Sequence, residues 1–225
     1  QGQENTLELG TGFFTIPLIA QLLGMPISKI NHLLKTYWDG RFSKDFGAYS
    51  YSVDLTKVVN FYVFIELFIT KELIASGVRN KKIFKAHEVL SKKFNHKYPF
   101  ADKRVIESIR ILNQQVAFQF DDNQTITLDG ADQYYIEDFV KDFKKKIDYD
   151  NELLMANRYW PLGKDHSIIV DPNHQYGNPT ILNRNIKTST IESYLRAGEK
   201  PEEIAELFEI STEAVKDVQT FYAAA

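Results

Sequence analysis

The side chains with the greatest chemical potential are carboxylates and histidines, because the chain has no cysteine and so no thiolate ligand or nucleophile. Clustered carboxylates can hold Mg²⁺ for nuclease chemistry, and six lie close in sequence: Asp121, Asp122, Asp129, Asp132, Glu137 and Asp138. The start of this stretch, however, has the Asp/Asn composition of a turn. The histidines match no metal-ligand spacing; they are His32, His87, His96, His166 and His174. We therefore predict no catalytic residue, no metal site and no cofactor.

A second set of polar residues suits contact with DNA. The segment after Pro26 predicts a helix with one apolar face, made of Ile27, Ile30, Leu33 or Leu34, and Tyr37. Its other face carries amide, hydroxyl, imidazole and ammonium groups: Ser28, Lys29, Asn31, His32, Lys35 and Thr36. Such an amide can read adenine, and a lysine can reach guanine or phosphate. We place Arg41 and Lys44 in a wing that follows this helix, where they would contact the phosphates of the DNA backbone.

The elements that must position this face have the pattern of a helix-turn-helix. Thr15 is a predicted N-cap, and Pro17 lies in the first turn of the first helix. Ala20, Gly24 and Ile30 stand at offsets of zero, four and ten residues, which suit a helix crossing, a left-handed turn and an apolar contact. Most pairs of amphipathic helices only build a core, so this pattern alone does not establish DNA contact.

The C-terminal segment repeats the pattern. Ala205 and Val215 are again ten residues apart, and Glu209 takes the place of the turn glycine. Either Glu209 is left-handed, at a cost of about 1 kcal/mol for its side chain, or this turn differs from the first. We expect helices from Thr188 to Ala197, Pro201 to Phe208 and Ser211 to Tyr222.

Between the two patterns, we expect a short strand over Ala48–Val53, followed by a long apolar helix capped by Asp54 and ended by Gly77. Asn80 is the predicted cap of the next helix, on whose apolar face His87 is a core residue. The long helix either fills the core of the monomer or forms a dimer interface through Val59, Phe61, Tyr62, Phe64, Ile65 and Phe68.

The predicted fold class is α+β, mainly helical with small β elements. Residues 13–97 form a winged helix-turn-helix domain, and residues 98–165 form a middle segment. In that segment, alternation around Phe118 predicts a hairpin that turns at Asp121–Gln124, and a helix runs from Tyr134 to Lys146. Residues 166–225 form a small winged-helix domain.

Charge is distributed unevenly along the chain, whose net charge is −3. Nine basic residues against two acidic ones give Arg79–Arg104 a local excess of +7, as phosphate anchoring requires. Between Glu192 and Asp217, eight acidic residues against three basic ones give −5, which would repel phosphate. No run approaches about 18 apolar residues, so we expect a cytoplasmic protein without membrane contact.

With these motifs placed, the chain resembles a family of bacterial antitoxins. The stretches Ile169–Pro172, Tyr176–Ile181 and Pro201–Ala205 are similar to the small winged-helix domain of unknown function DUF433, which is frequent in antitoxins of the VapB type. Residues 14–94 resemble a MerR-type helix-turn-helix. The turn residue Glu209 and the segment Asn183-Arg184-Asn185 depart from the family pattern.

This resemblance implies an antitoxin that binds a PIN-type ribonuclease toxin and represses its own operon. The expected partners are operator DNA, the toxin and a second copy of the chain, because paired DNA half-sites need paired recognition helices. The alternative is a stand-alone MerR-like regulator that responds to a ligand. A metal-dependent nuclease built on the carboxylate stretch is a third hypothesis.

Overall fold

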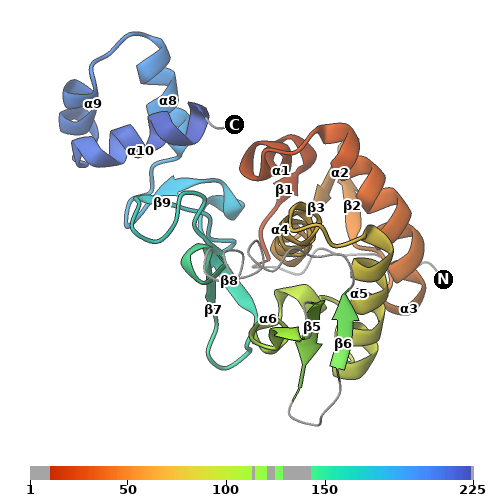
Figure 1. The fold of residues 1–225 in the computed structure, drawn as a ribbon. Helices are drawn as coiled ribbons and strands as arrows, with labels where there is room; N and C mark the ends of the chain where they lie inside the picture. The colour runs from red at the N-terminus through yellow and green to blue at the C-terminus, as the bar shows by residue number, and fades with distance from the viewer. Residues whose placement is uncertain (1–10, 113–114, 121–124, 129–142, 224–225) are drawn as a thin grey trace.

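The computed structural model describes residues 11–112, 115–120, 125–128 and 143–223, and it confirms an α+β fold with small antiparallel sheets (Figure 1). Helices α1 to α5 surround one small sheet, the sheet β4-β5-β6 lies at one end of the molecule, and α8 to α10 gather at the other. No helix in these ranges is long and apolar enough to cross a membrane.

Helix α1 (Ile16–Leu23) begins and ends as its sequence predicts. The Thr15 hydroxyl accepts a hydrogen bond from the Leu18 N–H at 3.3 Å, which satisfies one of the free amides of the first turn. Gly24 ends the helix in the left-handed conformation, at φ 58°, where a side chain would be strained. Helix α2 (Ile27–Leu33) then starts after Pro26.

Helix α2 continues without a break into η1 (Leu34–Phe42), a π-helix, and α3 (Ser43–Phe46). The prediction that Arg41 and Lys44 lie in a wing is therefore wrong: Arg41 is in η1 and Lys44 in α3. The helix continues because Trp38 and Phe42 recur at helical spacing and are both buried. Gly40 permits the wide turn, since a Cβ there would lie 2.5 Å from the Lys35 carbonyl oxygen.

A three-stranded sheet follows, in the order β1-β3-β2, from β1 (Phe14–Thr15), β2 (Ser50–Val53) and β3 (Thr56–Val59). Asp54 is not a helix cap, as predicted, but forms the tight turn between β2 and β3 together with Leu55; both residues have positive φ. Asn60 takes the capping role instead, and its Oδ1 accepts a hydrogen bond from the Val63 N–H at 3.0 Å. The reason is that Val58 and Val59 are β-branched and pair in the sheet, which delays the start of the helix.

Helix α4 (Phe61–Ala75) is the centre of the core and packs against α5 (Asn80–Phe94). Its apolar residues Phe61, Phe64, Ile65 and Phe68 are all at most 3% exposed, so they fill the monomer rather than a dimer interface. In α5, Arg79 rather than Asn80 is the cap residue. His87 is 1% exposed, which confirms its predicted core position.

In the middle of the chain, the described residues form short elements: η2 (Pro99–Ala101), α6 (Lys103–Glu107), β4 (Ile109–Leu112), β5 (Gln115–Gln119), β6 (Thr125–Leu128), β7 (Ile147–Tyr149) and β8 (Ala156–Tyr159). Strand β5 lies between β4 and β6, antiparallel to both, with Phe118 opposite Ile126. The predicted turn at 121–124 and most of the predicted helix from Tyr134 lie outside the described residues, and residues 143–146 are helical. The carboxylate stretch of the nuclease hypothesis also lies outside them.

The C-terminal elements are β9 (Ile168–Ile169), η3 (Gln175–Gly177), β10 (Thr180–Ile181), α8 (Thr188–Arg196), α9 (Pro201–Phe208) and α10 (Thr212–Ala223). The hydrophobic core continues from the N-terminal helices into this segment. The Tyr159 N–H donates to the Val170 carbonyl oxygen at 2.9 Å, and the Tyr159 ring packs edge-on against Phe64, with ring centres 5.0 Å apart. The C-terminal segment is thus attached to α4 through β8.

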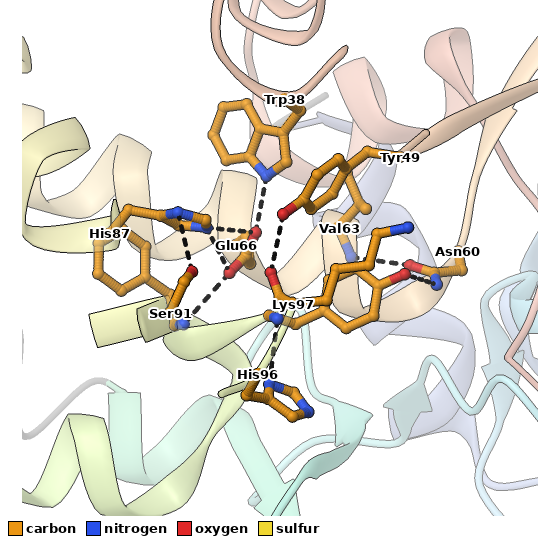
Figure 2. Close-up of polar contacts among 11 residues, drawn as sticks. Trp38, Tyr49, Asn60, Val63, Glu66, His87, Ser91, His96 and Lys97 are labelled. Carbon is orange, nitrogen blue, oxygen red and sulfur yellow. Dashed lines mark hydrogen bonds and ion pairs between the residues drawn. The ribbon is translucent and has the colours of Figure 1, made fainter. Parts of the chain in front are cut away.

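One buried carboxylate joins four elements of the N-terminal half. Glu66 of α4 is 0% exposed and accepts hydrogen bonds from the Trp38 Nε1–H at 2.7 Å and from the Phe100 N–H at 3.2 Å (Figure 2). Its oxygens also lie 2.9 and 3.0 Å from His87 Nε2. Residues of η1, α5 and η2 therefore all depend on this single acceptor, because a buried donor without a partner is costly.

We predict that Glu66→Gln lowers the free energy of unfolding by about 3 kcal/mol, because the amide NH₂ group would face the donors that the carboxylate now satisfies. Urea denaturation measures this loss. Glu72→Gln is the matched control on the same helix: Glu72 is partly exposed and pairs with Lys71 at 3.2 Å, so its loss should stay below about 1 kcal/mol. Equal losses in the two variants would contradict the role assigned to Glu66.

Candidate nucleic-acid interface

The two predicted helix-turn-helix turns have the same backbone geometry. Gly24 lies at φ 58°, ψ 38°, and Glu209 at φ 52°, ψ 45°. In each turn, the N–H of the residue that follows the left-handed one donates a hydrogen bond to the carbonyl oxygen of an alanine five residues earlier. The distances are 3.1 Å from Met25 to Ala20 and 3.0 Å from Ile210 to Ala205. Glu209 is thus left-handed, which is one of the two alternatives that the sequence leaves open.

The polar face of the helix after the first turn is open to solvent. Six predicted contact residues are exposed along α2 and the start of η1: Ser28, Lys29, Asn31, His32, Lys35 and Thr36. On the opposite side, Ile30, Leu33 and Leu34 are at most 2% exposed. Ile27 was predicted to join this apolar face but is 48% exposed, because it is the first residue of the helix. The six polar side chains are therefore available for contact.

The other two predicted contact residues, Arg41 and Lys44, lie farther along the same continuous helical run. Arg41 forms a bidentate ion pair with Glu88 of α5: its Nε donates to Oε1, and its Nη2 donates to Oε2 at 2.7 Å. Lys44 is exposed. The structure thus places all eight residues on one helical segment, although Arg41 would have to share its charge between Glu88 and a phosphate.

The basic stretch predicted from the sequence lies partly beside this segment, because α5 packs against η1. The Tyr37 ring stacks on Phe84, with ring centres 3.4 Å apart, and Phe42 stacks on His87. Lys85, also on α5, lies 3.9 Å from the same carboxylate that binds Arg41. Two cations therefore share Glu88, which leaves a local positive charge next to η1.

Asp39 fastens the β2–β3 hairpin to η1, a role that sequence reasoning missed. Its carboxylate accepts hydrogen bonds from the Ser50 hydroxyl at 2.6 Å and the Ser50 N–H at 3.0 Å, and lies 2.9 Å from Lys57 Nζ. Burial alone would raise the pKa of Asp39, but the bonds from Ser50 and Lys57 outweigh it and hold this pKa below its usual value. In the sequence, this role is indicated only by the position of Asp39 directly before Gly40.

The second helix-turn-helix differs from the first in charge. Four acidic side chains of α9 and α10 are exposed: Glu202, Glu203, Glu206 and Glu213. Leu207 lies among them with 59% of its surface exposed. Asp217 of α10 accepts a hydrogen bond from the Ser167 N–H at 2.7 Å and lies 2.8 Å from His166 Nδ1, which fixes these helices to the chain before β9. This surface suits a basic partner rather than phosphate.

Comparisons with known proteins concern the C-terminal segment and the fold of the chain. Residues 168–222 match a family described as a protein of unknown function, DUF433. No curated protein matches the chain. Among solved structures, the chain is similar to the X-ray crystal structure of Rv2018 from Mycobacterium tuberculosis, with a TM-score of 0.68, 12% identity, and coverage of 95% of this chain and 98% of that chain. At this identity, the likeness shows a shared fold alone.

We predict that Asp39→Asn lowers the free energy of unfolding by about 1 kcal/mol at pH 7, because the amide lacks the charge that pairs with Lys57 and its NH₂ group would face donors that the carboxylate now satisfies. Since the pKa of Asp39 is lowered by folding, its contribution is present above about pH 4 and is lost as the pH falls through the folded-state value. Urea denaturation at pH 7 and at lower pH measures the difference from wild type.

The difference between wild type and Asp39→Asn should therefore shrink on acidification. Asp45→Asn serves as the control, because Asp45 is 55% exposed and lies 3.8 Å from its partner Lys92; its effect should be small at every pH. A difference for Asp39→Asn that stays constant down to about pH 3 would contradict the account of this carboxylate.

Proposed function

We propose that this chain is a non-enzymatic DNA-binding protein whose reading element is the polar face of α2 and the start of η1. The observation that carries the proposal is the exposure of the six predicted polar residues on one helix face, directly after a left-handed helix-turn-helix turn. A helix presented in this way fits the major groove of B-DNA.

The residues of this face divide by the contacts that their chemistry allows. Asn31 can donate to and accept from an adenine edge, and Ser28 or Thr36 can bond to a base or a phosphate. Lys29 and Lys35 supply charge for phosphate or guanine contact, and Lys44 extends this charge along the segment. The β2–β3 hairpin, held by Asp39, would contact the DNA backbone as a wing.

The finer proposal is that the chain is a cytoplasmic antitoxin of the VapB type with a MerR-like N-terminal domain. The match of residues 168–222 to DUF433 supports it, because the sequence resemblance connects that domain with antitoxins. The acidic surface of α9 and α10 would face the basic RNA-binding cleft of a PIN-type toxin. A homodimer would place two α2 helices on two DNA half-sites.

The DNA proposal predicts a specific salt dependence for binding to the DNA upstream of the gene. Lys29→Ala and Lys35→Ala should each reduce the slope of log Kd against log salt by about 0.9, because each removes one phosphate contact. Asn31→Ala should lower the preference for upstream DNA over a random duplex by about tenfold. Fluorescence anisotropy over a salt series measures both quantities.

Lys200→Ala is the matched control, because Lys200 is 75% exposed but lies in the acidic C-terminal segment. It should leave the slope unchanged. If Lys200→Ala changes the slope as much as Lys29→Ala, or if none of the three α2 and η1 variants alters binding, DNA contact through this face is refuted.

The antitoxin role is tested by co-expression with the product of the adjacent gene. Complex formation and rescue of growth are the expected results, and substitution of Leu207 and Glu206 by lysine should weaken the complex while DNA binding persists. Absence of both complex and rescue would remove the antitoxin role. DNA binding that changes only with a small ligand would favour the stand-alone regulator instead.

A further inference from the structure

A cavity of about 600 Å³ lies in the middle segment, away from α2 and η1, and the proposed function does not use it. It is bounded by α6, the start of β4, residues 143–147 and β7. This volume is within the range of small-molecule sites in proteins, which is about 300–1,000 Å³.

The cavity combines apolar walls with excess positive charge. Ile106, Ile109, Phe143 and Ile147 contribute apolar surface. Lys103, Arg110, Lys144 and Lys164 also line it, and among the residues that the structure describes, Glu107 and Asp148 are the only acidic ones in the lining. Each acid is already paired, Glu107 with Lys103 at 3.9 Å and Asp148 with Lys164 at 2.6 Å. These two ion pairs leave two of the four lining cations without an acidic partner in the lining.

These two cations, Arg110 and Lys144, have no carboxylate partner in the described part of the chain. Nη1 of Arg110 donates to the carbonyl oxygens of Glu107 and Ile109, at 2.5 and 2.8 Å, so those bonds hold the guanidinium in place without neutralising it. Lys144 is exposed at the edge of the cavity. A fixed guanidinium beside an ammonium is a common binding arrangement for carboxylate, sulfonate or phosphate groups.

Tyr149 adds a neutral, largely buried side chain to the wall of the cavity. It lines the cavity, and its hydroxyl is buried without a hydrogen-bond partner among the described residues. Burial raises the pKa of Tyr149 well above its usual value, so the group stays a neutral donor. Buried hydroxyls normally have a partner, and the described residues supply none for Tyr149.

We propose that this cavity binds a small amphipathic anion, with its acidic group on Arg110 and Lys144 and its apolar body against Ile106, Ile109 and Phe143. The inference is independent of DNA binding, because none of these residues belongs to α2, η1 or the β2–β3 hairpin.

The test uses anilinonaphthalene sulfonate, a fluorescent anion with an apolar body, and the full-length chain. We expect saturable binding of one molecule per chain. Arg110→Gln and Lys144→Gln should each weaken it about tenfold, because each removes one charge-assisted contact. Lys145→Gln is the matched control, since Lys145 is an exposed neighbour that does not line the cavity, and should bind like wild type.

Competition identifies the chemical class. Octanoate should displace the dye, whereas octanol at the same concentration should not, because only the carboxylate can use the two cations. Far-UV circular dichroism and thermal denaturation confirm that each variant is folded. Equal displacement by octanol, or unchanged dye affinity in both Arg110→Gln and Lys144→Gln, would overturn the proposal.

Discussion

The architecture of the N-terminal half depends on one buried acceptor, the carboxylate of Glu66. A charge in a core is tolerated only when donors surround it, and here the donors come from η1, α5 and η2. The position of η1 is therefore fixed through Trp38, and the position of α2 through its continuity with η1. The exposed polar face of α2 is in this way oriented by a contact in the core.

The exposed charges differ in sign between the α2–η1 segment and the C-terminal helices, as the two proposed partners would require. The α2–η1 segment carries exposed lysines next to the two cations that share Glu88. The three C-terminal helices have the same helix-turn-helix geometry but an acidic surface. Backbone geometry alone therefore does not distinguish the two units, whereas the sign of their surface charge does.

Local rules predicted much of this fold from the sequence. The cap at Thr15 and the turn at Gly24 depend only on nearby residues, and the structure confirms them, whereas the sequence left the conformation of Glu209 open. The extent of η1 and the start of α4 were mispredicted, because burial of Trp38 and pairing of Val58 depend on residues far away in the chain. Glu66 could have been noticed as the one charged residue in the otherwise uncharged run Phe61–Thr70, but its donors, like the contacts of Asp39, are visible only in three dimensions.

Because the chain has no cysteine, a single introduced thiol reports directly on the central claim that α2 contacts DNA. Ser28→Cys lies on the proposed reading face, and Ser189→Cys is an exposed control on α8. The account predicts that saturating upstream DNA slows alkylation of the thiol at position 28 about tenfold or more and leaves position 189 unchanged. Unchanged alkylation at position 28 with DNA bound, or protection at position 189 alone, would contradict it.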